Sequence, residues 1–314
     1  MNDRLKKYRE EITARMVEAL KDGTAPWQQP WVSGGCDRSP INAISGRHYN
    51  GANALILLNI GFHLDNGADP RWLTFRQAVG KGWNIRKGEH GTAISFWKPL
   101  PVEVKGKDGK PMLDEDGNPV TRNVLVERLF IVFHASQVEG IPPYTPSNIN
   151  AVEAIEKAER IISDSGANIR YGGDRAFYRQ RGDFIQLPQK DAFTSTEGYY
   201  STVLHELSHW SGHSSRLNRD LSGRFGTEKY ASEELIAEIS SMFLSSETGI
   251  PQDEQHFQNH AAYVASWIQL LSSDSNALFK AASDASKASE FLLRKEHDRG
   301  MKGCDDNSDE TDVH

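Results

Sequence analysis

Hydrophobic and polar positions follow two patterns along the chain, and each pattern predicts a different kind of element. In the first half, apolar residues recur every three or four positions over residues 1–20, 51–60 and 73–80, which is typical of helices. Between residues 88 and 133 the pattern changes to runs of β-branched and aromatic residues on either side of the turn-rich segment GKDGKPMLDEDGNP. The first half therefore predicts short helices and an antiparallel hairpin.

The second half of the chain has mostly helical periodicity. Two or three short strands interrupt it, with candidates at residues 168–171, 176–180 and 183–187. Together the two halves indicate an α+β fold, in which a mixed helix and antiparallel-sheet domain is followed by a mostly helical domain with a small sheet. The predicted helices of the second half span residues 150–165, the stretch around residues 199–212, and residues 231–247, 256–271 and 277–293.

A proline-rich stretch, IPPYTP at residues 141–146, is typical of a linker between the halves. The chain of 314 residues is long enough for two domains with ordinary cores. We expect a first domain at residues 1–145 and a second at residues 146–296. Residues 297–314 contain the acidic run CDDNSDETD and predict a disordered tail.

Composition narrows the class of protein. No apolar run of about 18 residues or more is present, so we expect no membrane span and no membrane partner. The first segment has no signal-peptide core. The two cysteines, Cys36 and Cys304, support neither a disulfide framework nor a cysteine-based zinc site, and a reducing cytoplasm fits this usage. The net charge of −7 comes from the second half, whereas the first half has a small excess of Lys and Arg.

The pentad HELSH at residues 205–209 carries the clearest chemical signal. On a helix, residues four apart point to nearly the same side, so His205 and His209 can hold one metal ion from one face. Neutral imidazole nitrogens suit Zn²⁺, and a catalytic zinc takes three protein ligands and leaves a fourth position for water. Glu206 is close enough to that water to take its proton. The pentad therefore predicts a metal-dependent hydrolase with Glu206 as its general base.

The third ligand has several candidates. In the metzincin pattern HExxHxxGxxH, Gly212 fills the glycine position, but Ser215 stands where the last histidine belongs, which argues against that class. His213 faces the metal only if the helix continues through Gly212. Glu233 and Glu234 lie in a following helix and offer a carboxylate instead.

The acidic cluster EELIAE at residues 233–238 resembles the gluzincin arrangement. In that arrangement the first acidic residue binds zinc, and a second one four positions later steadies a metal-bound histidine. The resemblance implies Glu234 as the third ligand and Glu238 as the residue behind the histidine. The expected ion is Zn²⁺ or another divalent transition metal such as Mn²⁺. Glu233 stays open as the nearest rival for the ligand position, and His213 follows it.

Aromatic and basic residues interleave in the first half, which contains five of the seven tryptophans. Cationic side chains meet phosphates, and flat rings stack on bases that are exposed only in single strands. The same residue types also serve as core and solubilising positions in ordinary folds. The candidates for contact with single-stranded DNA are Arg47, Tyr49, Arg71, Trp72, Arg76, Trp83, Arg86, Lys87, Trp97 and Lys98.

Longer motifs resemble a known family over about residues 5–295. The segments TAPWQQPW, NAISGRHYNGANALIL, RWLTFRQA and GWNIRKGEHGTAISFWKP resemble the N-terminal domain of the ArdC-type antirestriction proteins of conjugative plasmids, which also occurs in plasmid primases. The segments YYSTVLHELSHWSGH and YASEELIAEISSMFL look like the metallopeptidase domain attached to it. The resemblance implies a protein that binds single-stranded DNA and protects incoming plasmid DNA from host restriction. It also implies a zincin-like second domain, with a host restriction-system protein or another polypeptide as its substrate.

Two rival hypotheses remain beside the peptidase. A pure single-stranded-DNA-binding protein would keep a structural metal site, but such a site does not need the general base Glu206. A metal-dependent nuclease is less favoured, because phosphoryl-transfer sites use oxygen-rich Mg²⁺ coordination rather than two histidines. For the group that stabilises the oxyanion of a peptidase, the sequence leaves Tyr200, Tyr230, His260 and Tyr263 open.

Overall fold

The structure, a computed structural model, describes residues 3–23, 39–65, 68–106, 109–146, 150–250 and 261–305. His260 lies outside these ranges, and so do two tryptophans of the first half, Trp27 and Trp31.

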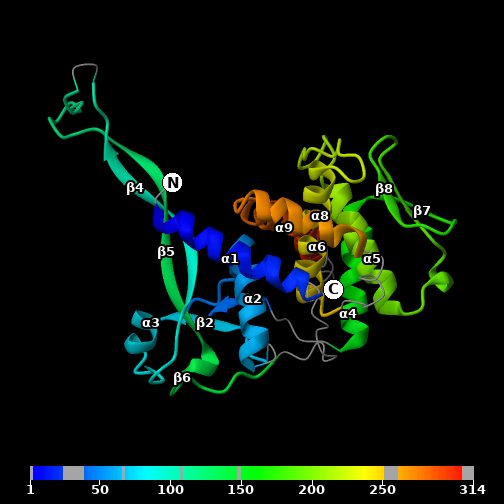
Figure 1. The fold of residues 1–314 in the computed structure, drawn as a ribbon, viewed down its shortest axis with the longest axis horizontal. Coiled ribbons are helices and arrows are strands. Elements are labelled where there is room, and N and C mark those ends of the chain that lie inside the picture. Colours follow the sequence, from blue (N-terminus) through cyan, green and yellow to red (C-terminus); the bar gives the residue numbers. More distant parts are fainter. Residues whose placement is uncertain are drawn as a thin grey trace, which may run out of the picture.

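A four-stranded sheet forms the centre of the first half (Figure 1). Its strand order is β1-β2-β5-β4, with β1 parallel to β2 and the other pairs antiparallel. The predicted hairpin is confirmed as β4 and β5, whereas the short strands before and after it were not predicted. The strands are β1 (Ile41–Asn42), β2 (Arg71–Thr74), β4 (Thr92–Glu103) and β5 (Thr121–His134), and β3 (Asn84–Ile85) pairs with β6 (Val138–Glu139) in a separate sheet.

Helices cover both faces of this sheet. One face, which contains Trp72, packs against α2, and the other, which contains Leu73, packs against α3. The helix expected from residue 73 begins later, because Thr74 ends β2 and caps α3 by accepting a hydrogen bond from the Gln77 backbone N–H. The helices of the first half are α1 (Asp3–Lys21), α2 (Gly51–Asp65) and α3 (Phe75–Gly80), and a 3₁₀ turn, η1, spans Ala135–Gln137.

The second half is built from helices around a small sheet, as predicted. The strand order is β7-β9-β8, so β9 is central and β8 lies at an edge. The α+β prediction is therefore confirmed. The elements are α4 (Ala151–Ser165), β7 (Asn168–Tyr171), β8 (Phe177–Arg179), β9 (Phe184–Leu187), the 3₁₀ turn η2 (Lys190–Ala192), α5 (Thr196–Ser211), α6 (Glu228–Thr248), α8 (Ala261–Ser273) and α9 (Ala277–Asp305).

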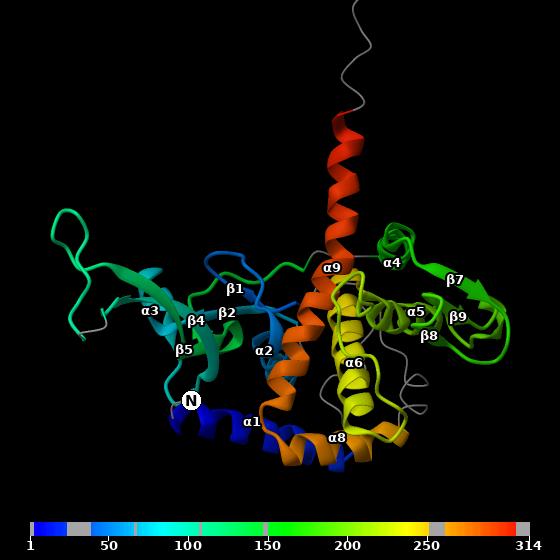
Figure 2. The ribbon, with the colours of Figure 1, turned by 90° about the horizontal axis from the view of Figure 1, so that it is seen from above.

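Helices from both halves share one hydrophobic core. Leu20 of α1 and Leu55 of α2 lie in the same buried cluster as Leu235 of α6 and Trp267 of α8. Figure 2 shows α1 and α8 next to each other along one side of the molecule. The boundary expected at residue 145 therefore separates the two sheets but does not separate their cores.

The expectation of a disordered tail from residue 297 is wrong for its first part. Helix α9 continues through Asp305, and Leu, Arg, Lys and Glu residues in the stretch FLLRKEHDR, which begins at Phe291, favour the helix as far as Arg299. Residues 306–314 lie outside the described ranges. Among the helices described, none is both long and apolar enough to cross a membrane.

Candidate metal centre

Two neighbouring helices, α5 and α6, carry the pentad and the acidic cluster. The side chains of Ser195 and Thr227 cap their first turns by accepting hydrogen bonds from backbone N–H groups. The helices approach closely at two small residues, where the Ser208 hydroxyl donates to the Ser240 hydroxyl at 3.0 Å. This close approach places the pentad opposite the acidic cluster.

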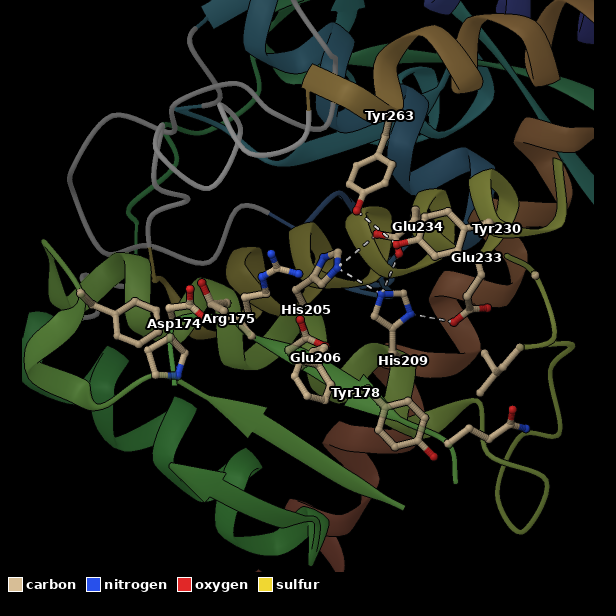
Figure 3. A pocket seen from close by; sticks show the side chains of 18 of the residues that line it. Asp174, Arg175, Tyr178, His205, Glu206, His209, Tyr230, Glu233, Glu234 and Tyr263 are labelled. Carbon is tan, nitrogen blue, oxygen red and sulfur yellow. Dashed lines mark hydrogen bonds and ion pairs between the residues drawn. The ribbon is translucent and has the colours of Figure 1, made fainter. Parts of the chain in front are cut away.

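His205, His209 and Glu234 converge at this contact (Figure 3). The Nε2 atoms of the two histidines are 3.2 Å apart. One carboxylate oxygen of Glu234 lies 3.6 Å from the Nε2 of His205, and the other lies 3.6 Å from the Nε2 of His209. The three side chains thus offer two nitrogens and a carboxylate to one point.

The other nitrogen of each histidine meets a second carboxylate. The Nδ1 of His205 lies 3.2 Å from Glu238, and the Nδ1 of His209 lies 3.1 Å from Glu233. Carboxylates in this position fix the ring orientation and the tautomer, so that Nε2 is left for a metal. Glu238 therefore has the place expected for it, whereas Glu233 lies behind His209 and not at the ligand point.

His213, the last rival for the third ligand, is not brought to the cluster. Helix α5 ends at Ser211, so His213 does not continue the face that carries the pentad. Its Nδ1 lies 2.8 Å from the Ser215 hydroxyl instead.

An arginine from the loop after α5 holds Glu233 in place. Arg219 donates to both Glu233 oxygens, at 2.8 and 3.0 Å, and also to the Ser208 carbonyl and the Ser211 hydroxyl, at 2.6 and 2.9 Å. Gly212 leaves the space for this guanidinium, because a Cβ there would lie 2.8 Å from Arg219. Arg219 was not predicted from the sequence, and Gly212 was interpreted as the end of the helix and as the glycine position of a motif, which agrees with its place after the last residue of α5.

Electrostatics at the cluster favours a positive charge at its centre. Burial lowers the pKa of His209, but Glu234 and Glu233 outweigh burial and raise this pKa to about 9. Against the same effect of burial, Glu234 and Glu238 raise the pKa of His205 well above its usual range. Burial raises the pKa of Glu234, but the two histidines outweigh burial and hold this pKa well below its ordinary value. The carboxylates around the two rings therefore stabilise positive charge at this point.

The donor set fits a divalent transition metal. Two imidazole nitrogens and a carboxylate oxygen are ligands that catalytic zinc sites use. Imidazole and carboxylate groups also suit other divalent first-row metals, such as Mn²⁺. Within the described ranges, His205, His209 and Glu234 form the one group of three His, Cys, Asp or Glu residues whose ligand atoms come this close together.

Glu206 lies at the wall of a cavity of about 710 Å³ beside this cluster (Figure 3). Its carboxylate is buried and accepts a hydrogen bond from the Tyr178 backbone N–H. The Oε2 atom of Glu206 has no hydrogen-bond partner among the residues that the structure describes. Burial raises the pKa of Glu206, although His205 and His209 oppose this effect. A carboxylate of this kind is suited to accept a proton at the cavity.

Two of the candidate oxyanion-stabilising tyrosines line the same cavity. The hydroxyls of Tyr230 and Tyr263 are 3.1 Å apart. Burial and the charge of Glu234 raise the pKa of Tyr230, so this hydroxyl keeps its proton and can donate it in a hydrogen bond. Tyr200 is not among the lining residues, because its hydroxyl donates to Glu159 at 2.7 Å.

Three residues expected to contact DNA are engaged in the fold of the first half. Trp72 is 1% exposed and packs edge-on against His134, with ring centroids 4.8 Å apart. Tyr49 is buried in the same cluster as Trp72. Arg71 donates two hydrogen bonds to Asp69. The prediction for Trp72 is wrong, because β2 places its ring on the sheet face that α2 covers. Tyr49 packs in the same cluster but also lines a cavity with Phe96 and Trp97, so its contact with DNA stays a prediction.

The other DNA candidates remain predictions, and the structure places most of them at the surface. Trp97 is 61% exposed on β4, and Trp83 is partly buried against the cluster under α3. The exposed basic candidates are Arg47, Arg76, Arg86, Lys87 and Lys98.

Comparisons with known proteins match each half to a described family. Residues 6–133 match the N-terminal domain of anti-restriction factor ArdC, and residues 156–284 match a zincin-like metallopeptidase. The DNA primase TraC of Escherichia coli is 46% identical over 296 residues, which cover 92% of this chain and 27% of the primase. The chain thus spans about a quarter of the length of this relative. The uncharacterized protein y4eC of Sinorhizobium fredii is 34% identical, and the match covers 92% of each chain.

Two solved structures have the same fold. The metal-free crystal structure of the antirestriction protein ArdC from plasmid R388 is 31% identical and superposes with a TM-score of 0.73, covering 92% of this chain and 98% of that one. The Mn(II)-bound structure of the same protein gives a TM-score of 0.72 and covers 97% of that chain. The zincin-like character predicted for the second half is confirmed by the family match over residues 156–284.

Proposed function

Because the chain belongs to the family of ArdC antirestriction proteins, we propose that it is a metal-dependent peptidase that also binds single-stranded DNA. In this proposal the two properties together protect incoming plasmid DNA from restriction. A protein of the recipient's restriction system is the class of polypeptide substrate that this function implies. In this proposal the protein acts on the DNA and on its polypeptide substrate in the cytoplasm.

The position of Glu206 carries the peptidase proposal. His205, His209 and Glu234 would hold the ion, which supplies Lewis-acid polarisation of the scissile carbonyl and acidifies the attacking water. Glu206 has an oxygen without a hydrogen-bond partner among the described residues, at the wall of the cavity that the histidines also line. It takes the proton of the attacking water and passes it to the leaving amine. A purely structural metal site would not need this carboxylate.

The shape of the cavity supports a polypeptide substrate. A volume of about 710 Å³ accepts a few side chains of a chain that passes through it. Phe177 and Tyr178 of β8 line the cavity, and β8 is an edge strand. An extended peptide can add to such an edge through backbone hydrogen bonds. Tyr230 or Tyr263 then donates a hydrogen bond to the oxyanion.

Exposed cations on the first half support the proposal that it binds DNA. Arg76, Arg86 and Lys87 are exposed near one another in the sequence, and no described hydrogen bond or ion pair engages their side chains. Free cations on a surface attract phosphates. Exposed aromatic rings on the same half add base stacking, which selects single strands.

Glu206→Gln tests the peptidase proposal, with Glu197→Gln as the matched control. Glu197 is an exposed residue at the start of the same helix and does not line the cavity. We expect Glu206→Gln to keep its metal and its fold but to lose cleavage of fluorescein-labelled unfolded casein, while Glu197→Gln behaves like the wild type. The measurements are metal content by mass spectrometry, circular dichroism, cleavage rate and conjugation into a restricting host.

The outcomes separate the rival functions. If Glu206→Gln loses cleavage but keeps full antirestriction, hydrolysis is not how the protein protects DNA, and the pure binding function replaces it. If Glu206→Gln loses its metal, the residue is a ligand and the assignment of the general base is wrong.

A further inference from the structure

The hairpin of β4 and β5 extends well beyond the body of the protein (Figure 1). Twelve consecutive residue pairs join the two strands, from Thr92–Val132 at the base to Glu103–Thr121 near the tip. Helix α2 covers only its base, where Ile94 and Val132 are buried. Past that base, both faces of the ribbon carry solvent-exposed side chains.

The register of the hairpin sorts its residues onto two faces. Residues directly opposite each other share a face, and successive residues alternate between faces. The face that continues from buried Ile94 towards the tip contains, on the two strands together, Phe96, Lys98, Leu100, Val102, Arg122, Val124, Val126, Arg128 and Phe130. We name this set the hairpin basic face.

The charges of the two faces differ. The hairpin basic face contains Lys98, Arg122 and Arg128 and no acidic residue. The opposite face contains Glu103 and Glu127, and Glu127 forms an ion pair with Arg9 of α1 at 2.6 Å.

The three cations of the hairpin basic face are exposed and are not used by the fold. Across the described residues, no hydrogen bond, ion pair or cation–π contact engages the side chain of Lys98, Arg122 or Arg128. They are spread along about 20 Å of the ribbon, because residues 96 to 102 of a strand rise about 3.4 Å each. A row of free cations of this length matches a polyanion.

Apolar side chains stand between these cations. Phe96 and Phe130 are 43% and 39% exposed and meet edge-on, with ring centroids 5.8 Å apart. Leu100 and Val102 are each 40% exposed. Duplex DNA would cover the cations with phosphates but would leave these side chains in water. The exposed bases of a single strand can cover both kinds of side chain.

We propose that the hairpin basic face binds the single-stranded DNA. Lys98, Arg122 and Arg128 contact phosphates along the strand, while Phe96 and Phe130 pack against bases. This inference rests on the proposed binding of single-stranded DNA and specifies the surface that carries it.

The test uses the full chain with Lys98, Arg122 and Arg128 all changed to Gln. The matched control changes Arg15, Lys21 and Lys81 to Gln, which removes the same charge from exposed positions of the first half that are not among the DNA candidates. Fluorescence anisotropy measures binding of a labelled 20-nucleotide single strand and of its duplex at several salt concentrations. Circular dichroism and metal content report whether each variant keeps the fold.

We expect the hairpin variant to bind the single strand at least about tenfold more weakly at low salt. Its slope of log affinity against log salt should become shallower by about 2, because each phosphate contact contributes about 0.7 in single strands. The control should change either quantity much less. A second variant, with Phe96 and Phe130 changed to Leu, should keep the salt slope and narrow the preference for the single strand over the duplex.

The binding measurements distinguish a wrong choice of surface from a wrong proposal that the protein binds single-stranded DNA. If the wild type binds no single strand at any salt concentration, the DNA-binding function falls and this inference falls with it. If the wild type binds and the hairpin variant binds equally well, the surface is wrong and the function stands. If the hairpin variant keeps DNA binding but loses protection in conjugation, the face serves a protein partner instead, and the proposal is overturned.

Discussion

Arg219 is expected to control metal affinity although it touches no metal ligand. The residue is missing from the motif and lies 14 positions before Glu233 in the sequence. Its guanidinium is 8% exposed and binds both oxygens of Glu233, whose side chain is 11% exposed and faces the Nδ1 of His209. Loss of this contact frees Glu233, and through it the ring of His209.

The burial of the Arg219–Glu233 ion pair decides how large a loss of metal affinity and stability to expect. Removing one partner of a buried ion pair costs about 3–5 kcal/mol of unfolding free energy, so Arg219→Ala risks losing the fold. Arg219→Lys keeps the charge and removes the two-pronged contact. Loss of an outer carboxylate contact typically weakens metal binding about 10- to 100-fold. We expect Arg219→Lys to fall in this range, which corresponds to about 1.4–2.8 kcal/mol.

Arg216 offers a control in the same loop. Its guanidinium is 10% exposed, forms an ion pair with Asp183 and donates to the Trp210 carbonyl at 2.7 Å, but it does not contact Glu233 or either histidine. Arg216→Lys should lower stability without changing metal affinity. The assay is titration of zinc in competition with a fluorescent chelator, accompanied by thermal unfolding with and without EDTA. Equal zinc affinity for Arg219→Lys and the wild type would refute the reasoning and leave Arg219 with a purely structural role.

Three further predictions concern the site and the domain boundary. His209→Ala should remove most of the bound metal measured by mass spectrometry, whereas His213→Ala should keep it, and unchanged content in His209→Ala would contradict the ligand assignment. In the metal-free protein the pKa of His209 is about 9, above its ordinary 6.5. The stability contributed by this protonation is full below pH 6.5 and is lost as the pH rises through 9. The rise in Tm on adding zinc should therefore be larger at pH 8.5 than at pH 6.5, and an equal rise would contradict the assignment. Residues 1–145 expressed alone should bind a dye for exposed apolar surface and lack a cooperative thermal transition, and a sharp transition without dye binding would show that they fold independently.

The cluster of His205, His209 and Glu234 was predictable because the relationship of its residues is local. A spacing of four residues places His205 and His209 on one side of any helix, and the same spacing relates Glu234 to Glu238. What local spacing does not give is the rotation of α6 relative to α5. That rotation decides whether Glu233 or Glu234 points to the ligand position, and packing at Ser208 and Ser240 sets it.

Arg219 and Trp72 show why the rest was not predictable. Arg219 lies in an irregular loop, and its direction depends on a contact with a helix that comes later in the chain. Trp72 lies in a strand of four residues that changes at once into a capped helix, so no alternation is long enough to be read. The aromatic and basic residues around Trp72 therefore predicted an exposed ring, whereas the fold buries this ring in its core. In the hairpin, by contrast, twelve paired positions alternate regularly, so the face on which each residue lies follows from the register.

The shared core links the two proposed activities in one folding unit. Met16 and Leu20 of α1 pack with Leu271 of α8, so the helix that opens the chain is buried by the second half. Arg9 of the same helix forms an ion pair with Glu127, midway along the hairpin. Helix α1 is therefore in contact with the hairpin through its charged side and with the helices around the metal centre through its apolar side. This arrangement gives a physical reason why the match with the TraC primases covers both halves together. A half alone would leave a large apolar face in water, at a cost of about 25 cal/mol for each Å² left exposed. Variants of the hairpin and of the metal centre are therefore best compared in the intact chain, where a change in one activity is not confused with the loss of the common core.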